Sequence, residues 1–137
     1  MGELIKLLYD LFKLNSDQFY SELMRLDFAI WVFGLTGLIS LFLVILYYYI
    51  IDRPLTAKLS VWLIFLVVNA IILSILAYVI AYNTIVDDYL SIGGEVPDYF
   101  IDLIYFSGMN FLIAALFFLI FSSMFKWKSS NSSHVPF

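Results

Sequence analysis

Residues 28–51 read FAIWVFGLTGLISLFLVILYYYII, a stretch without any Asp, Glu, Lys, Arg or His between Asp27 and Asp52. Two more stretches of the same kind follow at residues 59–86 and 103–125. A helix needs about 20 consecutive apolar residues to cross the roughly 30 Å hydrocarbon core of a bilayer, and each stretch is longer than that. The sequence therefore predicts an all-α membrane protein with three transmembrane helices.

The composition of the whole chain supports the same conclusion. Of 137 residues, 64% are hydrophobic and 13% are charged, whereas soluble domains contain about 45–50% apolar and about 25% charged residues. The net charge is -4 and no cluster of Lys or Arg is present, so nucleic acid is excluded as a partner. With no cysteine and one histidine, the chain has no disulfide and no His/Cys metal site within one subunit, and we expect no cofactor.

The charged residues divide the chain into three regions. We predict an amphipathic N-terminal helical arm over residues 1–27, a three-helix transmembrane domain over residues 28–125 and a polar C-terminal tail over residues 126–137. Pro54 cannot continue a helix, so the first two spans are expected to form an antiparallel hairpin. The spans are expected at about 29–51, 59–82 and 102–125.

Aromatic residues stand near the expected ends of these spans. Trp31 opens the first span, Trp62 opens the second, and Tyr78 and Tyr82 close the second. Trp127 follows the third. Because Trp and Tyr are enriched at both membrane–water interfaces, this distribution is typical of the two aromatic belts of a membrane protein.

The N-terminal arm begins with an amphipathic pattern. Glu3, Lys6, Asp10 and Lys13 recur at three- or four-residue spacing and form one polar stripe, while apolar residues cover the rest. As a helix this segment extends only about 18 Å, too short to span a bilayer, so we expect it to lie on the membrane or against a partner.

A second short helix is expected to follow in the arm. Asn15 with Gln18 three residues later resembles a capping box, which marks the start of a helix. Phe19, Leu23 and Leu26 then recur at helical spacing. We expect this helix to continue directly into the first span.

The orientation follows from the loops. Residues 83–101 carry acidic side chains and no Lys or Arg, whereas Arg53, Lys58, Lys126 and Lys128 lie beside other span ends. By the positive-inside rule the acidic loop and the N-terminus face outside and the C-terminus is cytoplasmic. The basic residues of the arm oppose this assignment.

The acidic side chains of this loop have two interpretations. They could collect cations at a channel mouth or ligate a hard divalent ion such as Ca²⁺, or they could be solvated surface groups, which is the interpretation we favour. No nucleophile–base pair and no glycine-rich phosphate loop accompanies them, so we expect no enzyme activity. The residues concerned are Asp87, Asp88, Glu95, Asp98 and Asp102.

Small residues recur at helical spacing within the spans. Such stripes let helix backbones approach closely in lipid, where association depends on packing and hydrogen bonds. We predict that they form helix contacts, either within the bundle or between subunits. The candidates are Ala70, Ser74, Ala77 and Ala81 in the second span, Gly108, Ala115 and Ser122 in the third, and Gly34, Gly37 and Ser40 in the first.

Two amides stand inside the spans. Asn69 and Asn110 each need a hydrogen-bond partner, because an unpaired polar group in hydrocarbon is costly. They could line a pore or contact a ligand, but we favour interhelical hydrogen bonds. Apart from Asp102 at the edge of the third, the spans contain no charged side chain and no His, which argues against a proton-driven motor subunit or an antiporter.

The leading functional hypothesis is a non-enzymatic subunit of a larger membrane complex, in contact with the lipid bilayer and with other membrane subunits or copies of itself. The polar tail ends in the apolar residues Val135, Pro136 and Phe137, which we predict to dock on a partner. The alternative is a self-assembling ion channel or pore, because three spans with this orientation resemble one class of phage holins in topology alone.

Overall fold

The computed structural model describes residues 2–51 and 59–126, and these residues are almost entirely helical. Three of the helices are long and apolar enough to cross a membrane, and a shorter helical segment precedes them. The predicted fold class is therefore confirmed. The elements are α1 (Gly2–Tyr9), α2 (Asp17–Arg25), α3 (Phe28–Leu46), the π-helical turn η1 (Tyr47–Ile51), α4 (Leu59–Ser91) and α5 (Phe100–Lys126).

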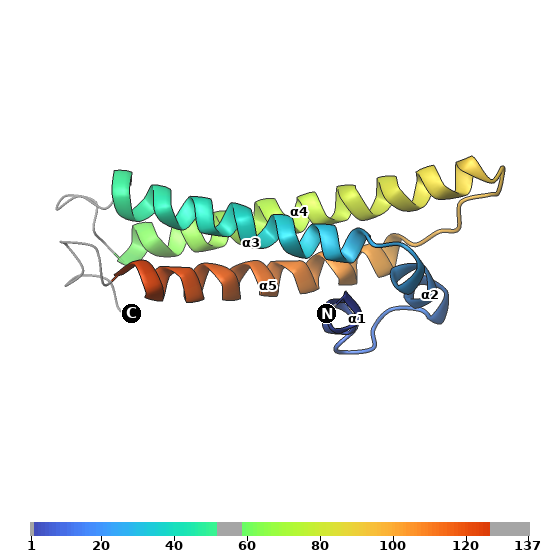
Figure 1. Cartoon of the computed structure of the whole chain (residues 1–137), viewed down its shortest axis with the longest axis horizontal. Coiled ribbons are helices and arrows are strands. Elements are labelled where there is room, and N and C mark those ends of the chain that lie inside the picture. The colour runs from blue at the N-terminus through green and yellow to red at the C-terminus, as the bar shows by residue number, and fades with distance from the viewer. Residues whose placement is uncertain (1, 52–58, 127–137) are drawn as a thin grey trace.

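The three long helices lie side by side in one bundle (Figure 1). α3 and α5 run in the same direction, and α4 runs in the opposite one. α1 and α2 pack at the end of the bundle where α3 and α5 begin. We call this end of the bundle the arm end.

Aromatic side chains form the core at the arm end. Phe19 of α2 and Phe28 of α3 both pack on Phe106 of α5, with ring centroids 6.3 and 5.3 Å apart and edge-to-face rings. Large apolar side chains also cover the outer faces of the three long helices, where many are more than half exposed. Helices that are apolar on all sides are typical of a bilayer environment, in which the outer side chains contact lipid.

The helix of the second span extends beyond its expected end, as far as Ser91. The difference arises because charged residues end a hydrocarbon-crossing segment without breaking a helix. The break comes from Gly93, whose φ of 67° is in the left-handed region. Its N–H bonds to the carbonyl of Leu90 and the Gly94 N–H bonds to the carbonyl of Tyr89, at 3.2 and 3.0 Å, which is the Schellman pattern of a helix end.

Two expectations about the arm are wrong. α2 is capped by Ser16, whose Oγ accepts the Phe19 N–H at 3.3 Å, and not by Asn15. α2 also ends before α3 begins, because Leu26 is extended (φ -95°, ψ 134°). The break lets α2 cross the arm end, where Phe19 and Leu23 are completely buried.

Candidate functional site

Asn110 of α5 connects four helices through one buried side chain. Its Nδ2 donates to the carbonyl oxygen of Leu73 on α4 at 2.8 Å. Its Oδ1 accepts hydrogen bonds from the Thr36 hydroxyl on α3 at 3.0 Å and from the Tyr9 hydroxyl on α1 at 2.6 Å. Because an unpaired amide in hydrocarbon is costly, these bonds fix the helices at one level of the bundle.

Asn69 of α4 forms interhelical hydrogen bonds at a second height along the bundle. Its Nδ2 donates to the Ser40 hydroxyl on α3 at 3.0 Å and to the Ala114 carbonyl on α5 at 3.3 Å. The Asn69 side chain is fully buried. Both amides that the sequence singles out therefore bond to neighbouring helices of the same chain.

Ser122 of α5 makes a third level, near the opposite end of the bundle. Its Oγ is 2.7 Å from the Tyr48 hydroxyl of η1 and accepts the Trp62 indole N–H of α4 at 2.8 Å. A further bond joins Ser74 of α4 to the carbonyl of Ser107 on α5 at 2.9 Å. Polar contacts therefore connect the three long helices at intervals along the bundle.

The small residues predicted on the second span lie inside the bundle. Ala70, Ala77 and Ala81 are completely buried, and Ser74 is half-buried. Ala77 and Ala81 pack in the cluster that contains Phe106 of α5. This face of α4 therefore contacts helices of the same chain.

The small residues on the first and third spans are distributed between the inside and the outside. Ser122 is buried and Ala115 is half-buried. Gly37 faces inward, since an added Cβ would lie 3.7 Å from the Phe117 ring. Gly34 and Gly108 are exposed, and no atom lies within 4 Å of the position that a Cβ would take at either residue.

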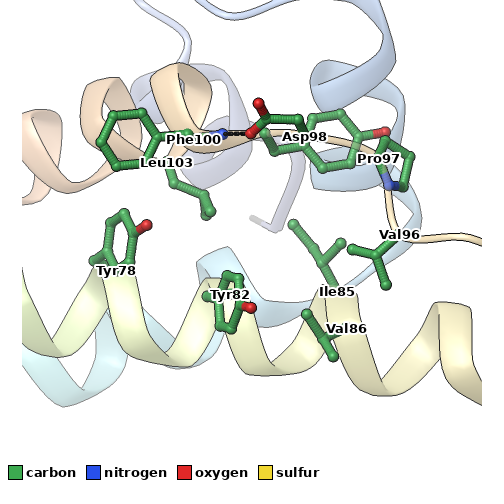
Figure 2. A pocket seen from close by; sticks show the side chains of 10 residues that line it. Tyr78, Tyr82, Ile85, Val86, Val96, Pro97, Asp98, Phe100 and Leu103 are labelled. Carbon is green, nitrogen blue, oxygen red and sulfur yellow. Dashed lines mark hydrogen bonds between the residues drawn. The ribbon is translucent and has the colours of Figure 1, made fainter.

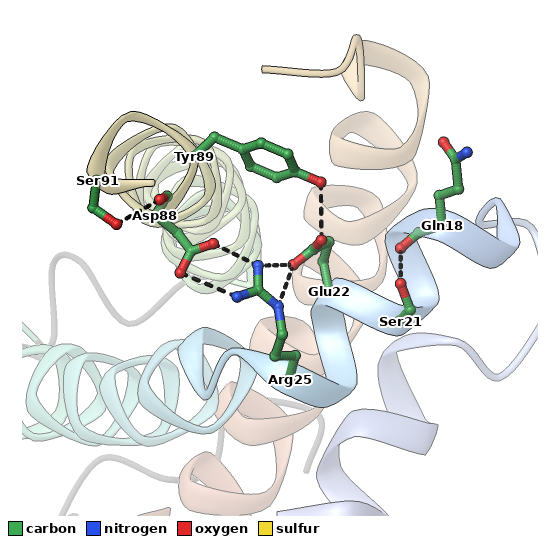
Figure 3. A network of polar contacts seen from close by, with 7 residues as sticks. All are labelled: Gln18, Ser21, Glu22, Arg25, Asp88, Tyr89 and Ser91. Atoms are coloured by element: carbon green, nitrogen blue, oxygen red, sulfur yellow. Dashed lines mark hydrogen bonds and ion pairs between the residues drawn. The ribbon is translucent and has the colours of Figure 1, made fainter. Parts of the chain in front are cut away.

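A charged cluster joins α2 to the far end of α4 (Figure 3). Arg25 contacts Glu22 at 2.6 Å and Asp88 at 2.5 Å, and the Tyr89 hydroxyl donates to Glu22 at 3.0 Å. Hydrogen bonding to Asp88 and then to Glu22 raises the pKa of Arg25, so the guanidinium stays charged. The Arg25 side chain is 51% exposed, so the cluster orients α2 and adds little stability. Burial, together with hydrogen bonding to Tyr89, raises the pKa of Tyr99 nearby.

Asp102 also connects the arm to the bundle. Its two carboxylate oxygens accept hydrogen bonds from the Ser16 N–H at 2.6 Å and from the Ser16 hydroxyl at 3.1 Å. Asp88 and Asp102 thus bond to different residues of the arm. Within residues 2–51 and 59–126, no three His, Cys, Asp or Glu side chains gather as a metal site would require.

α1 packs against the bundle in a way that the sequence pattern missed. Lys6, expected on a polar stripe, is buried, donates to the Met24 carbonyl at 2.7 Å and pairs with Asp27 at 2.9 Å. Tyr9 is also buried, and this burial raises its pKa. The only signal in the sequence is the spacing of Lys6 and Tyr9, which places them on one helix face. In consequence Leu4 and Leu7 point outward, and they are 73% and 52% exposed.

Among the hollows on the outer surface of the bundle, two are lined entirely by residues that the structure describes. The first, of about 310 Å³, lies on α3 around Gly34 and is apolar; we call it the Gly34 hollow, and it is lined by Ile30, Trp31, Gly34, Leu35 and Leu38. The second, of about 290 Å³, lies between α4 and the start of α5 (Figure 2).

Comparisons of the chain with protein-family models, with curated proteins and with solved structures find no match. The predicted docking residues Val135, Pro136 and Phe137 lie outside the described residues, as does the short connection between the first two spans.

Proposed function

We propose that the chain is a non-enzymatic integral membrane subunit that packs into a larger multi-subunit membrane complex and helps to assemble or anchor it. The observation that carries this proposal is the Gly34 hollow on α3. It is an open, apolar notch in the first half of α3, on a helix face where large apolar side chains are otherwise exposed.

The physical basis is the way helices associate in lipid. Apolar side chains gain little from leaving lipid for protein, so association depends on close packing, and small residues allow backbones to approach. Gly34 provides such an approach, and Trp31, which is 71% exposed, and Leu38, which is 66% exposed, provide apolar walls beside it. We propose that an apolar transmembrane helix of another subunit occupies this notch.

The arm offers a second contact surface. Lys6 and Tyr9 hold α1 to the bundle, while Leu4, Leu7 and Leu11 remain more than half exposed. This surface can contact lipid or a neighbouring subunit at the arm end. In the proposed orientation the N-terminus lies outside and the C-terminus lies in the cytoplasm. The apolar tail end, residues 135–137, is proposed as a third contact with a partner.

The alternative, an ion channel or holin-like pore, has less support. A pore through the bundle would need polar groups facing a lumen, but Asn69, Asn110 and Ser122 are buried and bond to other helices of the chain. A pore would then have to form between copies of the chain. Ion flux through vesicles that contain the purified protein alone distinguishes this alternative from an assembly subunit.

Co-purification from the native membrane tests the proposal. Gly34→Leu fills the notch and should reduce the yield of partner subunits about tenfold, since overpacking a close contact costs typically about 1–3 kcal/mol. Val67→Leu, at an exposed position of α4 outside the hollow, is the control and should leave the yield unchanged. Equal partner yields from wild type and Gly34→Leu would contradict the proposal, provided that both variants insert equally.

A further inference from the structure

The second hollow lies where α4 passes from its uncharged segment to the charged residues near its end. We call it the tyrosine pocket and define it by Tyr78, Tyr82, Ile85, Asp98, Phe100 and Leu103. Its volume of about 290 Å³ suits one small chemical group, because pockets for drug-sized ligands begin near 300 Å³. The pocket therefore fits a headgroup or a small molecule and not a macromolecule.

Aromatic rings form one wall of the pocket. Tyr78 and Tyr82 are parallel, with ring centroids 6.4 Å apart and an interplanar angle of 6°. Both side chains rise from α4 toward the start of α5, where Phe100 and Leu103 lie opposite (Figure 2). The faces of aromatic rings carry partial negative charge, so such a wall attracts cations.

A carboxylate stands at the rim of the same pocket. Asp98 is exposed, and one of its oxygens accepts the Phe100 N–H at 3.1 Å. The other oxygen forms no hydrogen bond to any residue that the structure describes. Residues 83–101 contain no Lys or Arg, and Arg25 is already paired with Glu22 and Asp88. The charge of the pocket is therefore complementary to a cation that comes from outside the chain.

The remaining lining indicates what kind of cation fits. Ile85 and Leu103 make the pocket floor apolar, which suits an alkylated ammonium better than a hydrated metal ion. The hydroxyls of Tyr78 and Tyr82 form no hydrogen bonds to the described residues, so they are available as donors to an anionic group. A zwitterionic group with an ammonium and a phosphate matches all of these features.

We propose that the tyrosine pocket binds the quaternary ammonium headgroup of a phosphatidylcholine lipid. The ammonium lies against the rings of Tyr78 and Tyr82 and near Asp98, and the tyrosine hydroxyls donate to the phosphate. The position of the pocket favours a lipid as the source of this headgroup. The pocket lies where the uncharged stretch of α4 ends at Asp87, which is where the aromatic belt of the membrane interface is expected. This inference stands apart from the assembly proposal and does not depend on the Gly34 hollow.

The test uses the full-length protein in vesicles of equimolar phosphatidylcholine and phosphatidylglycerol, which differ in the ammonium group. Native mass spectrometry then counts the lipids that remain bound after gentle removal of the vesicle. We expect about fivefold more phosphatidylcholine than phosphatidylglycerol on the wild type, a ratio typical of one partly exposed cation–π contact. Asp98→Asn, which keeps the ability to cap α5, and Tyr82→Leu should each abolish this preference.

Two matched variants serve as controls. Asp87→Asn removes an exposed charge outside the pocket, and Tyr105→Leu removes a partly exposed tyrosine of α5 outside it. Both should retain the wild-type ratio, and circular dichroism establishes that all variants are folded. Equal retention of the two lipids by the wild type, or loss of the preference in the controls alone, would overturn the proposal. Binding of soluble phosphocholine with no retained phosphatidylcholine would overturn the assignment to a lipid.

Discussion

Replacing Asn110 with alanine should lower the stability of the bundle by about 2 kcal/mol. The side chain makes three interhelical hydrogen bonds, with Tyr9, Thr36 and Leu73. Interhelical hydrogen bonds in membranes contribute about 0.6 kcal/mol each on average, so their sum is about 2 kcal/mol. The value is modest because the separated helices also find partners for their polar groups in the unfolded state.

The assay is reversible unfolding in mixed micelles, followed by circular dichroism as the fraction of denaturing detergent rises. Asn83→Ala is the control, because Asn83 is exposed on α4 and forms no hydrogen bond with the described residues. Asn83→Ala measures the effect of helix propensity alone, which favours alanine over asparagine. This effect is subtracted from the change in stability that Asn110→Ala causes. A double-mutant cycle of Asn110→Ala with Thr36→Val should yield a coupling energy of about 0.6 kcal/mol.

Two results would refute this reasoning. If Asn110→Ala costs no more than Asn83→Ala, the hydrogen bonds of Asn110 do not stabilise the bundle. If the double-mutant cycle gives no coupling while the single variant is destabilised, the bond to Thr36 contributes nothing and the sum over three equal bonds is wrong.

Three further predictions concern packing, orientation and the tail. Ala77→Leu should destabilise the bundle by about 1–3 kcal/mol in the same assay, because Ala77 is completely buried, whereas Val79→Leu at an exposed position should change it little. A cysteine at Ser91 should react with an impermeant reagent from outside the cell and a cysteine at Ser130 only after permeabilisation; the reverse pattern would invert the orientation. Deleting residues 135–137 should release a partner without preventing insertion, and identical partner yields from both chains would make the tail end an ordinary terminus.

The three spans could be predicted from the sequence because the bilayer imposes a simple rule. A long stretch without charge identifies a segment that crosses hydrocarbon, whatever its neighbours are. The end of the second helix could not be found in this way. Charges at Asp87 and Asp88 mark where hydrocarbon ends, while the helix continues to Ser91 and stops at Gly93, whose conformation satisfies the last carbonyls.

The hydrogen-bond partners of the buried polar groups could not be predicted from a single sequence. The depth of Asn69 and Asn110 follows from their positions in the spans, but their bonding partners depend on how each helix is rotated and shifted against the others. Tyr9 was missed because its partner, Asn110, is distant in sequence and α1 folds back to reach it. The polar stripe predicts an exposed Lys6, since amphipathic patterns alone do not reveal a buried carbonyl acceptor.

Site-specific photo-crosslinking in native membranes tests the assembly proposal most directly. A photoreactive amino acid at Leu38, in the wall of the Gly34 hollow, should give a discrete adduct whose mass exceeds that of the chain by one partner subunit. The same amino acid at Val79, on an exposed part of α4, should give lipid adducts alone. An adduct of twice the chain mass would identify a second copy as the occupant. If Leu38 forms no protein adduct, the proposal that this chain packs into a membrane complex through α3 is contradicted.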